Sequence, residues 1–332
     1  MILSTGEALV DMIAVDVGGR RLFEPVIGGS PLNVALGIAR LGRRAGHLTK
    51  LSTDMFGEAI AAFMDREGID RRFVRRSPRP TTMVYVAIDD RGTPSYAFHL
   101  EGTADRSMEI EDLPTQLPGE VEALHFGSIS LVLDPTASTL RGLMRREAGR
   151  RFISLDPNIR PSVMTDRAAH VARFGELLDH ADLIKASTED VAWLHPGEDP
   201  EAVAVRWSSS GPSLAVVTDG ERGLVAAIGG RAIRLPAAPV AVVDTVGAGD
   251  TFQAALLVRL AEEGLLERAT LAATRIEDLV PALGFAAAAA ALTCTRRGAD
   301  LPRRDEVADF VERRGRTDGS AVRAPFHRGE SG

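Results

Sequence analysis

The chain has 332 residues, of which 45% are hydrophobic and 26% are charged, an ordinary balance for a globular protein. This length fills one large α/β domain or two smaller ones. The net charge of −7 argues against nonspecific nucleic-acid binding, which needs a basic surface. The single cysteine, Cys294, excludes an intrachain disulfide framework and a cysteine-rich zinc site.

The apolar runs of the chain are short, and its first residues do not resemble a secretory signal. The longest run, residues 283–292, is mostly alanine and is shorter than the roughly 20 residues that cross a bilayer. Residues 1–7 lack the basic segment and the long apolar segment of a signal peptide. We therefore expect a cytoplasmic protein that has neither a membrane nor a nucleic acid as partner.

Two segments predict β-hairpins. Residues 9–27 turn at Gly18 and Gly19, a pair that suits a tight turn between strands. Residues 81–104 contain a second hairpin, which turns at the polar residues 89–92. Because isolated hairpins are marginally stable, we expect the two to pair into a small β-sheet that stands off the main sheet as a lid. Extra edge strands of the main sheet are the alternative.

Residues 28–42 predict a helix that begins after a glycine pair. Ser30 is the expected N-cap and Pro31 the expected first helical residue. The apolar stripe of this helix leaves Asn33 on another face, near the N-terminus. An amide beside glycines suits a polyol, whose hydroxyls need both donors and acceptors. In isolation, a capped surface helix explains the segment equally well.

The middle of the chain alternates short apolar strands with amphipathic helices, which is typical of a parallel sheet covered on both faces. Ligands of such sheets bind at the carboxyl ends of the strands. Asp156, Lys185 and Thr218 each stand at or just past a predicted strand end. The predicted strands are residues 123–126, 152–155, 183–185 and 214–218.

The segment with the clearest chemistry runs from Gly247 through Ala248 and Gly249 to Asp250. Apolar residues at helical spacing follow it as far as Gly264, so these four residues belong to the first turn of a helix. The first amides of a helix lack intrahelical acceptors and bind anions, including a transferring phosphoryl group. A carboxylate on the same turn can take the proton of an attacking hydroxyl. Read alone, an aspartate there also suits a simple helix start.

In this order and at this separation, residues 28–42 and 243–252 resemble the two signatures of the PfkB (ribokinase-like) carbohydrate kinase family. The resemblance extends to about residue 310 and includes the runs 156–160 and 216–223. It implies a three-layer α/β fold, with a mostly parallel central sheet, helices on both faces and a small β-sheet lid. It also implies an enzyme that transfers the γ-phosphoryl group of ATP to a sugar hydroxyl.

The resemblance assigns site residues to three groups. The catalytic group consists of the base and the amides of the anion hole: Asp250, Gly247, Ala248 and Gly249. The group that would bind the sugar consists of Asp11, Gly29, Asn33, Phe98 and Arg160. The group that would line the nucleotide site consists of Lys185, Ser187, Thr218, Gly220 and Gly223.

The resemblance also implies ATP and Mg²⁺ as cofactors, with Mg²⁺ held mainly by phosphates and water. The family's Asn-x-x-Glu element corresponds here to Ser187 through Asp190, a shorter acceptor pair, so Asp190 would contact the metal through water. An asparagine common near the adenine corresponds to Ala287. For K⁺, which many relatives bind, the candidate ligands are backbone carbonyls near Asp244, Val246 and Gly298.

The sugar is less constrained than the reaction. Residues 6–12 and 156–161 most resemble bacterial fructokinases, which makes fructose the expected substrate. The 2-keto-3-deoxygluconate kinases share the Asp-x-Asn-x-Arg pattern and are the alternative; the lid region offers them His99, Arg106 and Tyr96. A non-catalytic sugar- or nucleotide-binding regulator is a further alternative, against which the intact base and glycines argue.

Two further expectations concern organisation. Residues 1–312 should form one kinase domain, followed by a polar, mobile tail at residues 313–332. The exposed edges of the lid would allow a homodimer. An NAD-dependent oxidoreductase is excluded, because no Gly-x-Gly-x-x-Gly follows the first strand.

Overall fold

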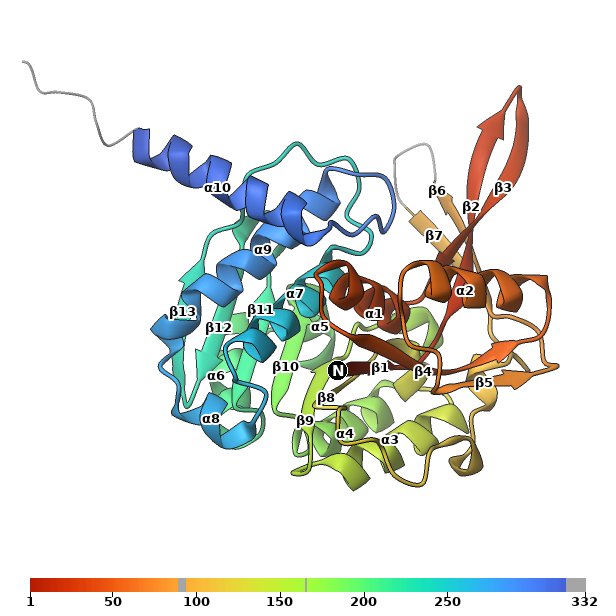
Figure 1. The fold of residues 1–332 in the computed structure, drawn as a ribbon, viewed down its shortest axis with the longest axis horizontal. Helices are drawn as coiled ribbons and strands as arrows, with labels where there is room; N and C mark the ends of the chain where they lie inside the picture. The colour runs from red at the N-terminus through yellow and green to blue at the C-terminus, as the bar shows by residue number, and fades with distance from the viewer. Residues whose placement is uncertain (89–93, 165, 321–332) are drawn as a thin grey trace, which may run out of the picture.

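The computed structural model describes the backbone of residues 1–88, 94–164 and 166–320. A nine-stranded sheet in the order β13-β12-β11-β10-β9-β8-β1-β4-β5 lies at its centre (Figure 1). In this order, the seven strands from β11 through β1 to β5 run parallel to one another. The strands β12 and β13 extend the sheet beyond β11 and are each antiparallel to their neighbour. The strands are β1 Ile2–Thr5, β4 Ala45–Ser52, β5 Val74–Ser77, β8 Ala123–Gly127, β9 Phe152–Asp156, β10 Leu183–Ser187, β11 Leu214–Thr218, β12 Leu224–Ile228 and β13 Arg231–Leu235.

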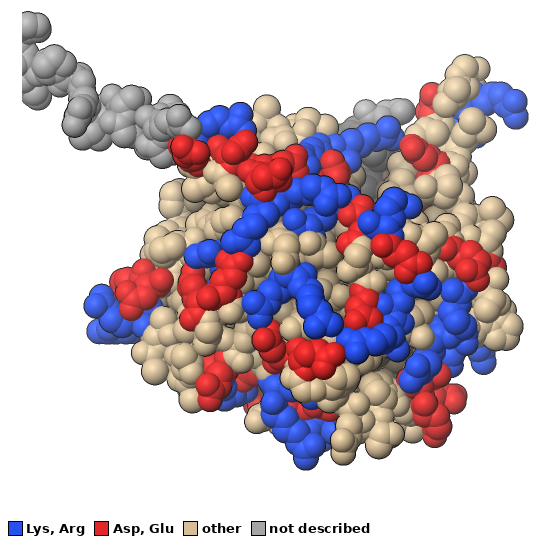
Figure 2. All heavy atoms as spheres, in the orientation of Figure 1, with Lys and Arg blue, Asp and Glu red and all other residues tan. Residues whose placement is uncertain are grey.

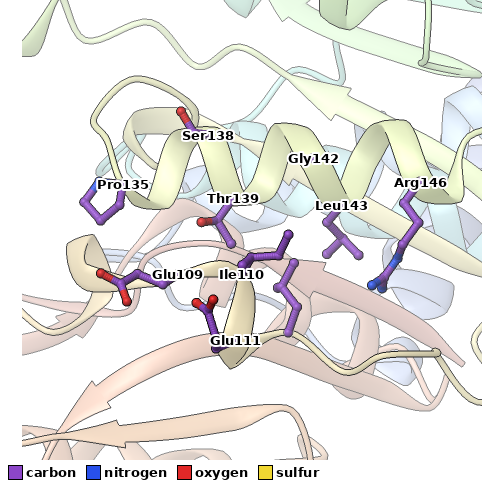
Figure 3. A pocket seen from close by; sticks show the side chains of 10 residues that line it. Glu109, Ile110, Glu111, Pro135, Ser138, Thr139, Gly142, Leu143 and Arg146 are labelled. Atoms are coloured by element: carbon purple, nitrogen blue, oxygen red, sulfur yellow. The ribbon is translucent and has the colours of Figure 1, made fainter.

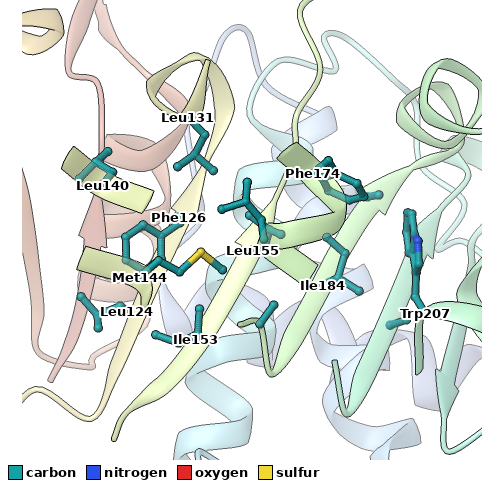
Figure 4. Close-up of a cluster of buried hydrophobic side chains, with 14 of the residues drawn as sticks. Leu124, Phe126, Leu131, Leu140, Met144, Ile153, Leu155, Phe174, Ile184 and Trp207 are labelled. Atoms are coloured by element: carbon teal, nitrogen blue, oxygen red, sulfur yellow. The ribbon is translucent and has the colours of Figure 1, made fainter. Parts of the chain in front are cut away.

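Helices cover both faces of this sheet, which confirms the expected three-layer α/β fold. Helices α3 to α6 pack on one face, in the apolar cluster drawn in Figure 4. Helices α1 and α7 to α10 pack on the other. The helices are α1 Ser30–Arg40, α2 Met55–Arg66, α3 Thr136–Glu147, α4 Arg167–Leu178, α5 Thr188–Leu194, α6 Pro200–Ser210, α7 Ala248–Glu262, α8 Arg268–Ala273, α9 Val280–Cys294 and α10 Arg304–Ser320.

The four predicted strands are present as β8 to β11, each within two residues of the expected end. Burial on both faces explains their almost continuous apolar sequence. In β9, for example, Ile153 and Leu155 belong to the α3–α6 layer, whereas Phe152 faces the helices of the other layer. The parallel strands therefore all end at one edge of the sheet, where Asp156, Lys185 and Thr218 lie.

The two predicted hairpins pair into a separate four-stranded sheet in the order β3-β2-β6-β7. We call it the lid sheet; Figure 1 shows the β2–β3 hairpin projecting from the body of the protein. Gly18 and Gly19 both have positive φ at its turn, as the sequence predicted. The alternative of extra edge strands on the main sheet is wrong, and the expected turn at residues 89–92 lies outside the described residues. The strands of the lid sheet are β2 Leu9–Val17, β3 Arg20–Gly28, β6 Met83–Ile88 and β7 Pro94–His99.

The start of α1 differs from the expectation in one respect. Gly29, with φ 110°, precedes the helix, and Ser30 is its first residue rather than a side-chain cap. Pro31 follows within the first turn, as expected. The Ser30 hydroxyl is therefore free to bind outside its own helix.

Helix α10 runs from Arg304 to Ser320 and so continues past residue 313, where the polar tail was expected to begin. Val307 is buried against the layer of α7 and α9, and Phe310 packs on the same cluster, so apolar contacts hold the first turns of this helix. The remainder of the expected tail, residues 321–332, lies outside the described residues.

One segment, Ile276–Cys294, is long and apolar enough by composition to span a membrane, with a mean hydropathy of 1.4. This segment is longer than the run of residues 283–292 considered above, because it also includes the turn before α9 and both ends of α9. Half of it is buried inside the fold. Its alanines pack against α7, and a core helix of this kind passes the same test of length and composition.

The surface in the orientation of Figure 1 carries basic and acidic side chains interspersed (Figure 2). Several form ion pairs, such as Arg40 with Glu67 at 2.9 Å and Arg304 with Glu262. Arg40 also donates to the Leu301 carbonyl at 2.6 Å, which ties α1 to the segment before α10.

Candidate active site at the start of helix α7

Helix α7 begins as the sequence predicted. Gly247 precedes it with a left-handed φ of 79°, and Asp250 lies buried in its first turn, only 8% exposed. A side chain at residue 247 would also collide with Ala299, since an added Cβ would lie 2.8 Å from the Ala299 Cβ. The Ala248 amide makes a long bond of 3.2 Å to the Thr245 carbonyl. The helix start thus presents backbone amides and a buried carboxylate together.

Helix α1 holds that carboxylate from the side. The Asn33 amide group donates to one Asp250 oxygen at 2.9 Å, and the Ser30 hydroxyl donates to the other at 2.6 Å. Asn33 was predicted to bind sugar hydroxyls, but in this structure it binds the candidate base. The sequence did not identify Ser30 as a functional residue, because its partner lies 220 residues away in the chain.

Asp11, on lid strand β2, lies close enough to Asp250 for the two charges to interact. Burial raises the pKa of Asp11 to about 6; the positive charge of Arg160 lowers it, and Asp250 raises it further. The exposed Arg160 guanidinium donates to the Ile159 carbonyl at 3.0 Å and to the Asn158 carbonyl at 3.3 Å. The structure therefore brings together three of the predicted site residues from the lid, α7 and the end of β9.

Phe98 belongs to the same row of the lid sheet as Asp11. Asp11 is paired with Val84 on β6, and Val84 is paired with Phe98 on β7, so the three residues share one face. Phe98 also packs, partly buried, against an apolar cluster that joins the lid to the main domain. Its position fits both a cover for the sugar and a residue of the lid core.

Lys185 and Asp156 form a buried ion pair, with 2.7 Å between Nζ and Oδ2. Burial raises the pKa of Asp156 to about 6, against the opposing charge of Lys185 and with the repulsion of Asp190. Burial opposes the charge of Lys185, but the surrounding carboxylates outweigh it and raise the pKa of its ammonium. An added Cβ on Gly249 would lie 2.9 Å from the Lys185 Nζ, so this ammonium lies directly beside the first turn of α7.

A cleft of about 470 Å³ opens beside this turn. Thr218, Gly220 and Gly223, all predicted for the nucleotide site, line it together with Gly249. Gly223 has φ 100°, and an added Cβ would lie 2.7 Å from the Ala237 amide nitrogen, so only glycine fits there. The apolar part of the lining comes from Val240, Val242, Phe252, Ala287, Ala290 and Ala291.

Ser187 and Asp190 do not line this cleft. They form a reciprocal cap at the start of α5, in which the Ser187 amide and hydroxyl both donate to one Asp190 oxygen at 2.8 Å. The other Asp190 oxygen accepts the Ile159 amide at 2.7 Å. This pair therefore braces the loop that follows β9, next to Arg160.

The three candidate K⁺ positions lie together. The Asp244 carboxylate accepts the Val246 amide at 3.0 Å and the Gly298 amide at 2.8 Å, which joins two distant loops. Carbonyl oxygens in such loops suit K⁺. For a divalent ion, no group of three or more His, Cys, Asp or Glu side chains within the described residues could hold a metal. Phosphates and water would have to supply most ligands of Mg²⁺.

A second hollow, of about 560 Å³, lies between α3 and the turn at residues 109–113 (Figure 3). Glu109, Glu111 and Arg146 line it along with apolar side chains. None of the predicted site residues lines it, and it is separate from α7. The first turn of α7 is thus the place where the sequence-derived residues converge.

The start of α7 combines a buried carboxylate, an adjacent ammonium, a cleft at the carboxyl ends of parallel strands and a separate lid sheet. This combination is what a phosphotransferase site of the sugar-kinase type requires. Residues 1–306 match the family described as pfkB family carbohydrate kinase, and the chain belongs to that family. It is accordingly a carbohydrate kinase, a phosphotransferase with an alcohol group as acceptor.

Several relatives are fructokinases. The chain is 40% identical over 273 residues to fructokinase of Rhizobium leguminosarum bv. trifolii, which covers 82% of this chain and 83% of the relative. It is 35% identical over 308 residues to fructokinase of Klebsiella pneumoniae, covering 91% and 96%. Both confirm the resemblance to bacterial fructokinases.

Solved structures agree with the fold. Fructokinase from Xylella fastidiosa with bound ATP has a TM-score of 0.87 at 29% identity, covering 95% of this chain and 98% of that one. A double mutant of fructokinase from Vibrio cholerae O395 with fructose, ADP and a potassium ion has a TM-score of 0.80 at 27% identity, covering 93% and 97%.

Proposed function

We propose that the protein is an ATP-dependent fructokinase and that Asp250 is its catalytic base. The observation that supports this most is the position of Asp250: buried in the first turn of α7, between the donors of α1 and a cleft lined by Gly249. The names of the fructokinase relatives support the choice of sugar. An ATP-dependent metabolic kinase of this kind would work in the cytoplasm.

In the proposed reaction, a fructose hydroxyl loses its proton to Asp250 as its oxygen bonds to the γ-phosphorus of ATP. The bond between that phosphorus and the bridging oxygen of ADP breaks, and ADP leaves with the electron pair. The amides of Gly247, Ala248 and Gly249 and the ammonium of Lys185 would stabilise the charge on the transferring group. Mg²⁺, held by the phosphates and through water by Asp190, would neutralise part of the same charge.

The remaining roles that we propose are those that the family resemblance implies. Asp11, Gly29 and Asn33 would hold sugar hydroxyls at the junction of the lid and α1, with Phe98 and Arg160 beside them. Thr218, Gly220 and Gly223 would line the nucleotide site, and Ser187 would act through its cap on Asp190. Backbone carbonyls near Asp244, Val246 and Gly298 would bind K⁺. The kinase domain would end within α10.

The lid sheet favours fructose over 2-keto-3-deoxygluconate. That sugar acid needs a cation or donor for its carboxylate, and His99, Arg106 and Tyr96 were the candidates; the side chain of Tyr96 lies outside the described residues. His99 is paired with Met83 and makes an edge-to-face contact with Tyr85, on the lid face opposite to Asp11 and Phe98. Arg106 donates to the Leu100 carbonyl at 3.2 Å, beneath the lid. His99 therefore does not face the Asp11 side.

The test is a coupled assay of ATP consumption with fructose, 2-keto-3-deoxygluconate, ribose and adenosine at one concentration. We expect turnover to be highest with fructose. A higher rate with 2-keto-3-deoxygluconate would make that sugar acid the substrate in place of fructose. An absence of activity with all four compounds would favour a non-catalytic regulator.

We also propose a homodimer through the lid sheet. Val17, Leu22 and Val26 of the projecting hairpin are 57%, 43% and 37% exposed. The strand register places all three on the same face as Asp11, so a second copy would cover apolar surface next to the site. Light scattering of the protein and of Leu22→Asp tests this: the wild type should be a dimer and the variant a monomer.

A further inference from the structure

Ser30 makes the shorter of the two hydrogen bonds that the candidate base receives. Its hydroxyl donates to Asp250 Oδ1 at 2.6 Å, while Asn33 Nδ2 donates to Oδ2 at 2.9 Å. The two donors are three residues apart, on one face of the first turn of α1. Because each donor binds a different oxygen, the two hydrogen bonds together fix the rotation of the carboxylate about its Cβ–Cγ bond.

This use of a serine departs from local helix chemistry. A serine at a helix start usually accepts the amide of the second or third residue of its own helix. Here the helix begins without any side-chain cap, and Ser30 donates to another helix instead. The Ser30 hydroxyl therefore does not cap α1 and instead joins α1 to α7.

The backbone around Ser30 is fixed from two sides. Gly29 passes so close to the Glu7 carbonyl that an added Cβ would lie 2.7 Å from its oxygen. The Ser4 hydroxyl donates to the Pro31 carbonyl at 2.6 Å, which ties the first turn of α1 to strand β1. The Ser30 side chain thus starts from a rigid position.

The distance between α1 and α7 is fixed as well. Gly37 faces Ala254, one turn beyond the base, and an added Cβ on Gly37 would lie 2.6 Å from the Ala254 Cβ. This contact lets the two helices approach closely enough for a side chain as short as serine to reach Asp250. Small residues at helix contacts permit such close approach.

We propose that Ser30 is a positioning residue for the phosphoryl transfer: it orients the Asp250 carboxylate toward the hydroxyl that attacks. The proposal rests on the proposed role of Asp250 as the base. Ser30 acts on the base and not on the bound sugar, so its loss should reduce turnover and leave binding of both substrates nearly unchanged. Asn33, which is also proposed to hold the sugar, should affect both quantities.

The first experiment is steady-state kinetics of Ser30→Ala with fructose and ATP. We expect kcat to fall about 10-fold, the scale of one hydrogen bond to a charged group, with both KM values within about 2-fold of wild type. Ser30→Thr, which keeps the hydroxyl, should recover most of the turnover. Ser210→Ala is the matched control, because that exposed serine donates to the Arg206 carbonyl of its own helix, at 3.0 Å, far from the site.

A double-mutant cycle separates orientation of the base from a general structural effect. In the Asp250→Asn background, Ser30→Ala should cost no further turnover, because the base that it orients is gone. A loss that adds fully to that of Asp250→Asn would overturn the proposal. So would a rise in either KM that accounts for the whole effect.

The outcomes also distinguish this proposal from the proposed function. Near wild-type turnover of Asp250→Asn would contradict the role of the base itself. A large loss in Asp250→Asn combined with wild-type kcat in Ser30→Ala would contradict only the role of Ser30. If Ser30→Ala folds poorly, as judged by its thermal unfolding, two other variants give the same comparison. Ser30→Thr keeps a hydroxyl donor, whereas Ser30→Cys replaces it with a thiol, and kcat should be higher for Ser30→Thr.

Discussion

The ammonium of Lys185 and the carboxylate of Asp156 lie 2.7 Å apart, both buried, beneath the first turn of α7. The N-terminus of a helix is electropositive, so a buried cation next to it is unfavourable without compensating negative charge. Asp156, Asp190 and Asp250 supply that charge in this structure. A bound polyphosphate would supply more of it, which links the stability of this region to the proposed nucleotide.

Lys185→Met should therefore destabilise the protein as well as impair it. Removal of one member of a buried ion pair leaves an uncompensated charge and costs about 3–5 kcal/mol. Urea unfolding of Lys185→Met should show this loss, and the double variant Lys185→Met/Asp156→Asn should recover part of it. Equal stability of the single and double variants would mean that the pair is not coupled.

Asp250→Asn should lower turnover by about 10²–10⁴, the usual contribution of a general base. The asparagine keeps the size of the side chain, so calorimetry should show fructose binding close to that of the wild type. Asp309→Asn, at an exposed position on α10, is the control for loss of a carboxylate. Retention of most activity in Asp250→Asn would assign the base elsewhere.

Asp11→Ala should weaken fructose binding far more than ATP binding, because Asp11 belongs to the lid and not to the cleft of the nucleotide site. Its pKa of about 6 adds a dependence on pH. An ionised carboxylate is the better acceptor, so affinity for fructose should rise as pH increases through 6. Calorimetry at pH 5 and pH 7.5 measures both effects, and an equal loss of fructose and ATP affinity in the variant would contradict the assignment.

Glu7 should make folding stability depend on pH. Burial raises its pKa from 4.5 to about 7, with the Ser130 and Ser128 hydrogen bonds opposing. Between these two pKa values the folded protein keeps the proton that the unfolded chain has lost. The contribution of Glu7 to the free energy of unfolding is therefore complete below pH 4.5 and is lost as pH rises through 7. The loss is on the order of 3 kcal/mol.

Glu7→Gln should remove that dependence. The difference in unfolding free energy between wild type and variant should change by the stated amount between pH 4.5 and pH 8, in favour of the variant at high pH. Other groups that titrate, such as His47 and His125, contribute equally to both proteins and cancel in this difference; burial lowers the pKa values of these two histidines to about 3. A flat difference across this range would mean that Glu7 is not protonated in the folded protein.

Gly249→Ala tests the contact between the helix start and Lys185. Its Cβ would lie 2.9 Å from the ammonium and should displace it, lowering turnover by about 10-fold or more; outright loss of an anion-hole donor costs about 10²–10³. Gly142→Ala on α3 is the control, since an added Cβ there meets nothing within 4 Å. That control should keep wild-type kinetics.

Much of the fold could be predicted from patterns that are local in the chain. The strands that became β8 to β11 are apolar because both their faces are buried, and Gly18-Gly19 specified a hairpin turn by itself. The start of α7 was predicted from glycines followed by apolar residues at helical spacing, and Gly264, with φ 71°, follows its end as expected.

What the sequence could not provide were partners distant in the chain. Ser30 has the local appearance of a helix cap, and only the packing of α1 on α7 reveals its bond to Asp250. Likewise, the sequence did not show that Ser187 and Asp190 cap the start of α5 together, or that Asp190 also accepts the Ile159 amide. Helix α10 continues past residue 313 although its sequence there is polar on every side, a composition that does not by itself predict a packed helix.

The lid and the base are joined by very little chain. Strand β3 ends at Gly28, and α1, whose Ser30 holds Asp250, begins two residues later. Gly29 is thus the only residue between the end of the hairpin that would cover the sugar and the side chain that orients the base. The Glu7 carbonyl and the Ser4 hydroxyl fix this junction, so the hairpin and the donor of the base keep one relative position. A sugar covered by the hairpin would therefore meet a proton acceptor that is already aligned.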